Sequence, residues 1–222
     1  SREAAREPAP DVGDRGPTGR RGDDPRDEAR AAAGIVLGPD DRLAGDARVD
    51  ERRLDVCRLD AHPGDLHLVV GAAEVISHFC TERQRKLFVG RMTNGEFAGT
   101  MCLSESQAGS DVGAATTMAY KQPDGTYKIK GTKCWISGGD HDLAKNVVHL
   151  VLARIEGAMA GTKGLSLFIV PKHRVNDDGS LGQRNDVTVP SIEHKMGING
   201  SATCVLQFGD DDACLGELVG GA

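Results

Sequence analysis

The sequence predicts an α+β fragment, in which a short helical segment is followed by an antiparallel β-barrel or β-sandwich. Two observations lead to this fold class. Apolar residues recur at intervals of three and four over residues 66–92, which is the spacing of a helix face. After Gly95 the apolar period changes to two, and turn signals separate about seven strand-like runs with no helical pattern between them.

Two helices are predicted before Gly95. The first has one apolar face, formed by Leu66, Val69, Val70, Ala73, Ile76 and Phe79. Thr81 begins the second helix, because Gln84 three residues later completes a capping box. The buried stripe of this second helix is Leu87, Phe88 and Met92. Asn94-Gly95 then ends the helix, as these residues commonly do.

The strand-like runs follow, separated by turn residues such as Pro123-Asp124-Gly125. Residues 146–155 (NVVHLVLARI) are almost continuously apolar, which predicts a strand that is buried on both faces. Residues 172–186 form a long polar excursion in which no strand is predicted. The predicted strand-like runs are 96–105, 115–121, 126–137, 146–155, 164–171, 187–198 and 202–210.

The first 65 residues differ in composition from the rest. They contain twelve arginines, no lysine and no aromatic residue, whereas the remainder holds nine lysines and all eight aromatics. So little apolar surface cannot offset the entropy of ordering, so we expect disorder, or a loose helix around residues 29–33. The same composition is also typical of GC-rich DNA translated in a wrong frame.

Composition and charge exclude several functions. The net charge is −6 and no basic stripe is present, so nucleic acid is not an expected partner. The apolar runs are too short for a membrane span. Six scattered cysteines without a C-x-x-C pair or a signal peptide indicate reduced thiols in a cytoplasmic protein. His149 lies within an apolar run and is expected to be a hydrogen-bonded core residue, and no metal site is predicted.

Two polar loops that adjoin strands are the remaining candidates for chemistry. Residues 104–111 (SESQAGSD) are rich in hydroxyl and carboxylate groups, and residues 135–139 (WISGG) combine an indole, a hydroxyl and bare backbone N–H groups. Such groups suit a planar heterocycle with hydrogen-bonding edges. The plainer alternatives are an ordinary surface loop and a core tryptophan followed by a Gly-Gly turn. Because one predicted hairpin separates the two loops, both are expected to open on the same edge of the barrel.

The segments MCLSESQAGSDVG (101–113) and GTKCWISGG (131–139) resemble the middle domain of the acyl-CoA dehydrogenases. The resemblance runs from about Leu66 to Gly209, and it implies a barrel rather than a sandwich. The polar excursion and SIEHKMGINGSATC (191–204) resemble most the branch that contains 3-methylmercaptopropionyl-CoA dehydrogenases. Further matching segments are TERQRKLFVGRMTNGEFAGT, NVVHLVLAR, GTKGLSLFIVPK and IEHKMGINGSATC.

This resemblance implies FAD-dependent α,β-dehydrogenation of an acyl-CoA in fatty acid metabolism, with hydride passing to flavin N5. Ser104 is implied to hydrogen-bond the flavin ring, and Ser110 to lie near the FAD pyrophosphate and the acyl-CoA substrate. Trp135 is implied to pack on the isoalloxazine, with the Ser137 hydroxyl near N5. The implied cofactor-binding residues are Met101, Cys102, Leu103, Ser104, Gly109, Ser110, Trp135, Ile136 and Ser137. An electron-transfer flavoprotein or similar acceptor, and a homo-oligomeric parent, are further implications.

The sequence departs from the family pattern at three positions. Serines stand at 104 and 137 where threonine is usual, which keeps the hydroxyl but loses a methyl group that restricts the rotamer. Ser106 replaces a usual proline, so this loop is expected to be less rigid.

The expected organisation has four parts. These are a disordered or out-of-frame leader (1–65), the terminal helices of an N-terminal α domain (66–96), a flavin- and acyl-CoA-binding barrel (97–212) and a truncated tail (213–222). The family's general base is a glutamate in a C-terminal helical domain, and neither Glu105 nor Glu193 is assigned to that role.

The chain alone is therefore expected not to turn over, with no catalytic residue assigned to it. Two alternatives remain at this point. One is a related flavin oxidase or nitroalkane-type enzyme on the same scaffold, and the other is a truncated gene product without function.

Overall fold

The computed structural model describes residues 63–221. The predictions made for residues 1–62 lie outside the described residues. The elements are α2 (Pro63–Phe79), α3 (Glu82–Thr93), β1 (Phe97–Cys102), η3 (Val112–Ala114), β2 (Met118–Lys121), β3 (Tyr127–Ser137), β4 (Asn146–Ile155), η4 (Thr162–Gly164), β5 (Leu165–Pro171), β6 (His173–Val175), β7 (Leu181–Arg184), β8 (Val187–Ile192), β9 (Thr203–Phe208) and β10 (Leu215–Leu218).

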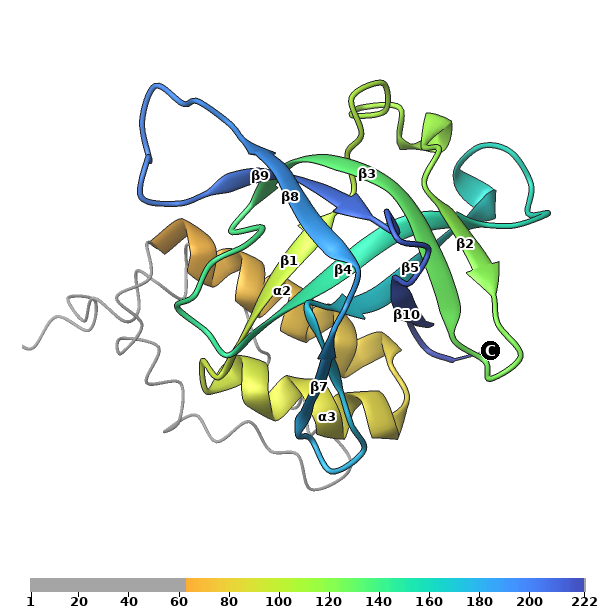
Figure 1. The fold of residues 1–222 in the computed structure, drawn as a ribbon, viewed down its shortest axis with the longest axis horizontal. Coiled ribbons are helices and arrows are strands. Elements are labelled where there is room, and N and C mark those ends of the chain that lie inside the picture. The colour runs from red at the N-terminus through yellow and green to blue at the C-terminus, as the bar shows by residue number, and fades with distance from the viewer. Residues whose placement is uncertain (1–62, 222) are drawn as a thin grey trace, which may run out of the picture. The chain divides into compact units, whose positions relative to one another are not determined.

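Five strands close a barrel, because each pairs with the next and the last returns to the first. The ring runs β2–β3–β10–β5–β4 and back to β2. β1 pairs with the first part of β4, and β9 followed by β8 extends the sheet from β3 (Figure 1). The prediction of two helices followed by a β-barrel is confirmed.

The sheet is mixed, which corrects the prediction of a purely antiparallel barrel. β1 and β2 both run parallel to β4, whereas the other pairings are antiparallel. Residues 103–145 carry the chain from β1 through β2 and β3 before β4 begins. A long crossover of this kind returns the chain in its original direction, as a parallel pair requires.

The predicted tail, residues 213–222, contains a strand of the barrel. β10 pairs with β3 on one edge and with β5 on the other. The buried Asn185 fixes its start, because the Asn185 side chain accepts a hydrogen bond from the Leu215 amide (2.9 Å) and donates to the Leu215 carbonyl (2.7 Å). The barrel therefore extends beyond the expected boundary at residue 212.

The polar excursion, residues 172–186, also contains more structure than its sequence predicts. β6 and β7 form a separate two-stranded antiparallel sheet. Two hydrogen bonds hold its turn. The Asn176 amide donates to the Ser180 carbonyl at 2.9 Å, and the Asp178 carboxylate accepts from the Ser180 amide at 2.9 Å. The sequence does not predict this hairpin, because β6 is only half-buried and β7 is largely exposed, so their side chains are mostly polar.

Apolar side chains form two cores. One fills the barrel interior and includes Phe168 and Phe208. The other lies between the two helices and the outer face of the sheet, and it includes Phe88 and Leu150. β4 contributes to both, since Leu150 faces the helices and Val151 faces the barrel interior. Its continuously apolar sequence correctly predicted a strand buried on both faces.

The second helix begins and ends as predicted. The Thr81 hydroxyl accepts a hydrogen bond from the Gln84 amide (3.3 Å), and the Gln84 side chain accepts one from the Thr81 amide (3.1 Å). Asn94 is the C-terminal cap and Gly95 follows with a φ of 78°. The predicted stripe of Leu87, Phe88 and Met92 is buried. Local capping and tertiary burial therefore agree in this helix.

The helices approach β1 closely because residue 99 is glycine. A Cβ atom at Gly99 would lie 2.5 Å from the Met92 methyl and 2.9 Å from the Ala72 Cβ. Phe79 does not belong to the buried face as predicted, since it is 68% exposed. It is the last residue of α2, and the following Cys80 enters the core in its place.

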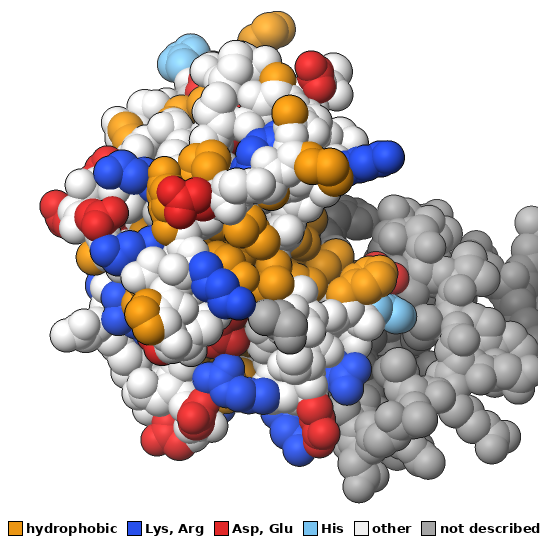
Figure 2. Space-filling model, turned by 90° about the vertical axis from the view of Figure 1, so that its right-hand side faces the viewer, with side chains coloured by type: hydrophobic (Ala, Val, Ile, Leu, Met, Phe, Trp, Pro, Cys, Tyr) orange, Lys and Arg blue, Asp and Glu red, His pale blue; other side chains and the backbone are white. Residues whose placement is uncertain are grey.

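Apolar side chains also remain at the surface of the described residues. Figure 2 shows apolar side chains in a hollow near the centre of one face, with charged side chains around it, and further single apolar side chains towards the rim. Apolar surface that gathers in this way commonly marks a contact surface. The large exposed apolar side chains of the described residues are Phe79, Trp135, Leu143, Met159, Leu181, Ile192, Met196 and Ile198.

His149 is a core residue, as predicted. It is 1% exposed, its Nδ1 atom lies 2.8 Å from the Thr100 hydroxyl, and its ring meets the edge of Phe208 at 6.0 Å. Burial lowers the pKa of His149 to about 4, with opposing smaller effects from the charges of Asp140 and Lys172. The imidazole is therefore neutral at pH 7.

This burial makes the free energy of unfolding depend on pH. The unfolded chain binds a proton at His149 near pH 6.5, whereas the folded chain does so only near pH 4. The contribution of His149 to the free energy of unfolding is therefore fully present above pH 6.5. It falls by about 3 kcal/mol as the pH decreases to 4. Urea unfolding of the wild type and of His149→Gln across this range measures the effect. An equal pH dependence in both proteins would contradict it.

Candidate functional site

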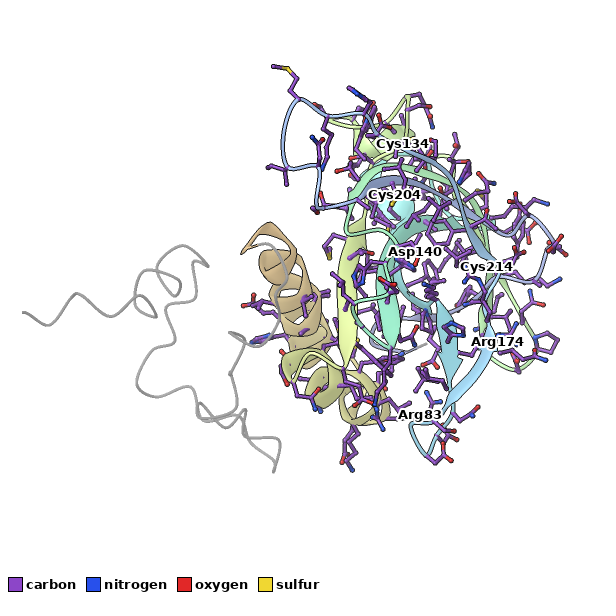
Figure 3. The ribbon with its side chains drawn as sticks, turned by 60° about the vertical axis from the view of Figure 1, so that its left-hand side comes forward. Arg83, Cys134, Asp140, Arg174, Cys204 and Cys214 are labelled. Carbon is purple, nitrogen blue, oxygen red and sulfur yellow. The ribbon has the colours of Figure 1, made fainter. Side chains whose placement is uncertain are left out.

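The two polar loops meet at one end of the barrel, as predicted. The Ser104 carbonyl, just after β1, accepts a hydrogen bond from the Cys134 amide of β3 at 3.0 Å. Trp135 follows Cys134 directly, and Ser137 ends the same strand. Figure 3 shows Cys134 and the β9 residue Cys204 towards the same end of the barrel. The structure therefore brings Ser104 next to the segment that carries Trp135.

A β-bulge turns Trp135 outward. The pairing of β3 with β9 shifts between Lys133 and Ile136, whose side chains both point inward and are buried. In a regular strand Trp135 would share the inward face of Lys133, but the bulge re-aims it. Its backbone has a φ of 60° and its side chain is 54% exposed. A left-handed conformation in a bulky residue costs about 1–3 kcal/mol, and such strain is concentrated at functional sites.

Two hydroxyls of the joined loops are available to a ligand. Among residues 63–221, neither the Ser104 nor the Ser137 hydroxyl has a hydrogen-bond partner. The Gly138 amide is different, because it donates to the Ala202 carbonyl at 2.8 Å within the sheet. The expectation of bare N–H groups in residues 135–139 therefore fails at Gly138.

Side-chain alternation divides the predicted cofactor-binding residues between two faces. Cys102 and Ile136 are 0% and 3% exposed and belong to the barrel core. Their side chains therefore do not face a ligand outside the barrel. Met101 and Leu103 are partly exposed and alternate with Cys102. Met101 packs on the outer, helix-side core.

Gly109 and Ser110 lie further along the same loop and are exposed. Among the described residues, the Ser110 hydroxyl makes no hydrogen bond to Ser104, Trp135 or Ser137. The base of the loop is closed by a short bridge between Glu105 and Ala108, with N–O distances of 3.0 and 3.1 Å. A backbone hydrogen bond thus joins Ser104 to the tryptophan segment, and no such bond joins Ser110 to it among the described residues.

Arg154 of β4 holds the far end of this loop. Its guanidinium donates to the Gly113 carbonyl at 2.9 Å, to the Gly161 carbonyl at 3.0 Å and to the Met159 carbonyl. Three carbonyl acceptors on one planar cation fix the loop that follows Ser110 against the β4–β5 connection.

A buried ion pair lies beneath the two loops. The Lys133 ammonium and the Glu105 carboxylate are 2.9 Å apart, and their side chains are 0% and 3% exposed. Lys133 also donates to the Leu103 carbonyl at 3.0 Å. One lysine of β3 therefore binds the backbone on one side of Ser104 and the side chain on the other.

Glu105 accepts six hydrogen bonds. Besides Lys133, the donors are the backbone amides and the hydroxyls of Thr116 and Thr117. The sixth donor is the side-chain amide of Gln107, and all six distances are 2.6–3.0 Å. Burial raises the pKa of Glu105, but hydrogen bonds from Thr117, Thr116 and Lys133 outweigh it and hold the pKa well below its usual range. Burial lowers the pKa of Lys133, and the nearby Glu105 carboxylate opposes that effect. The 2.9 Å contact between the two groups has the geometry of an ion pair.

The sequence prediction overlooked the role of Lys133 and Glu105 in this arrangement. Lys133, two residues before the tryptophan, lies on the inward face of its strand. Tyr127 and Ile129 establish that face by alternation. Continuing the alternation to residue 133 would have placed an ammonium group inside the barrel, where it needs an anion.

Three further features of the described residues concern metal binding, membrane crossing and the cysteines. No group of three or more histidine, cysteine or acidic side chains among residues 63–221 is arranged to hold a metal ion. Within the same residues, neither helix has the length and apolar character that a membrane crossing requires. The five described cysteines are all free thiols.

The described residues form a helix pair packed on a closed barrel, with two polar loops joined at one end of it. This is the class of domain to which the comparisons also assign the chain. Residues 100–210 match the model of the acyl-CoA dehydrogenase middle domain. The chain belongs to the acyl-CoA dehydrogenase family, and the resemblance noted in the sequence is confirmed.

Similar proteins of known name agree with this assignment. A butyryl-CoA dehydrogenase from Syntrophomonas wolfei is 51% identical over 154 residues, which cover 69% of this chain and 25% of that protein. A 3-methylmercaptopropionyl-CoA dehydrogenase from Ruegeria pomeroyi is 43% identical over 153 residues, which cover 69% and 26%. The crystal structure of an acyl-CoA dehydrogenase complexed with FAD from Bacillus anthracis superposes with a TM-score of 0.53 at 29% identity, covering 69% of this chain and 24% of that one. The chain spans about a quarter of the length of these relatives.

The unequal partners of the buried pair give a testable asymmetry. Glu105→Leu leaves Lys133 unpaired and removes the acceptor of five further donors, whereas Lys133→Met leaves those five bonds in place. We expect Lys133→Met to lower the free energy of unfolding by about 3 kcal/mol and Glu105→Leu to lower it by more. Urea unfolding at pH 7 measures both. Lys86→Met, in an exposed pair with Glu82, is the control and should change little. Equal losses at Glu105 and Lys133 would refute the asymmetry.

Proposed function

We propose that this chain is the flavin- and acyl-CoA-binding portion of an FAD-dependent acyl-CoA dehydrogenase. One observation carries the proposal: the indole of Trp135 is held towards solvent on a strained backbone, and the Ser104 and Ser137 hydroxyls of the joined loops have no partner among the described residues. Protein stability alone favours the opposite arrangement, with the indole buried and the bulge absent. A planar ligand on this indole would account for the strain.

The groups at this end of the barrel fit FAD. The flavin ring offers a flat apolar surface with polar edges, and Trp135, Ser104 and Ser137 supply an aromatic surface and two free hydroxyls. Ser110, with Gly109, would lie towards the pyrophosphate and the acyl-CoA substrate, and Met101 and Leu103 would supply apolar contacts. When bound, FAD would supply the acceptor for a hydride from the substrate β-carbon. The protein hydroxyls would orient the ring and stabilise negative charge at its edge.

We infer that the base for the α-proton is not among the described residues. Glu105 is the carboxylate nearest to Ser104, but it is buried and accepts six hydrogen bonds, so it cannot reach a substrate. We therefore propose that the polypeptide binds but does not dehydrogenate an acyl-CoA. An electron-transfer flavoprotein as acceptor, homo-oligomerisation and a cytoplasmic role in fatty acid metabolism complete the proposal by analogy with the family.

FAD binding can be measured through Trp135, which is the only tryptophan in the sequence. Flavin absorbs where tryptophan emits, so we expect added FAD to quench the Trp135 emission of the full chain in a saturable way. Ser104→Ala should weaken binding by roughly three- to tenfold through the loss of one hydrogen bond. Ser106→Ala, the same change two residues away, should leave the affinity unchanged. An emission that FAD does not alter would sink the proposed function.

The absence of turnover has its own test. We expect the full chain loaded with FAD to keep its yellow absorption when butyryl-CoA is added under anaerobic conditions, because we assign the α-proton base to none of the described carboxylates. Absorption at about 450 nm, a general property of oxidised flavins, reports the result. Bleaching on addition of the thioester would show that the base lies within the chain.

A further inference from the structure

We propose that Lys133 and Glu105 are positioning residues, which hold Ser104 and the Trp135 bulge in register for a flavin. The inference rests on the proposed function. Neither residue would touch the ligand, because both side chains are buried beneath the loops. Their effect would pass through the backbone segments that they join.

The first step is the bond from Lys133 to the end of β1. The ammonium lies on the strand that carries Trp135, two residues before it, and donates to the Leu103 carbonyl at 3.0 Å. It also reaches Glu105 at 2.9 Å. Ser104, between these two acceptors, is therefore held from both sides. Its carbonyl then accepts the Cys134 amide at 3.0 Å.

The second step fixes the other side of the carboxylate. Glu105 binds the amide and hydroxyl groups of Thr116 and Thr117, which lead into β2. Thr117 packs against Gly131 of β3 so closely that a Cβ atom at Gly131 would lie 2.5 Å from the Thr117 hydroxyl. One carboxylate thus joins the end of β1, the start of β2 and the middle of β3.

The third step concerns why this junction is ionic. The same volume filled by apolar side chains would often be as stable, because desolvation of two charges offsets most of their attraction. Hydrogen bonds, unlike apolar contacts, fix direction, and this network has satisfied partners for its carboxylate. A junction that sets direction suits a site in which the bulge must keep Trp135 outward at the level of Ser104.

The test uses the full chain and three variants. These are Lys133→Met, Glu105→Gln and Ile169→Ala, a control on β5 that leaves a cavity in the helix-side core. FAD affinity comes from Trp135 quenching, and hydrogen exchange at the Cys134 amide is followed by NMR without flavin. We expect both pair variants to bind FAD at least about tenfold more weakly, as the loss of a supporting contact commonly does, and to exchange Cys134 faster. Ile169→Ala should retain both properties although it is destabilised.

The outcomes separate this inference from the proposed function. If the wild type does not bind FAD, the proposed function fails and the inference fails with it. If the wild type binds FAD and Lys133→Met binds equally well, only the inference is overturned and the pair is merely structural. Equal losses of affinity in Ile169→Ala and the pair variants would also overturn it, because general destabilisation would then explain the result. Unchanged exchange at Cys134 in Lys133→Met would contradict the first step.

Discussion

A buried charge that must be neutralised organises one end of this barrel. Lys133 lies on the inward face of β3, where the alternation of the strand would otherwise place an apolar residue. An unpaired ammonium there would be strongly unfavourable. The Glu105 carboxylate, just after β1, accepts a hydrogen bond from this ammonium. It also accepts hydrogen bonds from the Thr116 and Thr117 amides, just before β2. The paths of three chain segments therefore depend on satisfying a single ammonium group.

The same region separates residues that stabilise the fold from those that face a ligand. Lys133 and Ile136 point inward, and the bulge between them sends Trp135 outward. Cys102 is likewise internal, while Met101 and Leu103 alternate with it on the other face. A family motif that runs continuously along the sequence thus contains two interleaved sets of residues, one for packing and one for recognition.

Much of this fold could be read from the sequence, because local and tertiary preferences agree in its long elements. The capping box at Thr81 and the apolar run of β4 are examples. The sequence does not predict β10 or the β6–β7 hairpin, because these strands are short and their residues are polar or include glycine. The position of β10 also depends on a distant partner, Asn185. The meeting of Ser104 with the Trp135 segment was predicted, but the buried pair beneath it was not. Residue spacing predicts which loops are neighbours, whereas the carboxylate that a buried lysine selects depends on the folded arrangement.

β10 completes the barrel, and it therefore bears on where this domain ends. β10 is only four residues long, yet it occupies the gap between β3 and β5 and is hydrogen-bonded on both sides. Without it, two neighbouring strands would present open edges, which readily associate with other chains. A boundary drawn at the end of β9 would therefore expose both of these edges. Val219, just after β10, also belongs to the fold, because its amide donates to the Leu167 carbonyl at 2.9 Å and its side chain packs on the helix-side core. The natural cut lies beyond Val219.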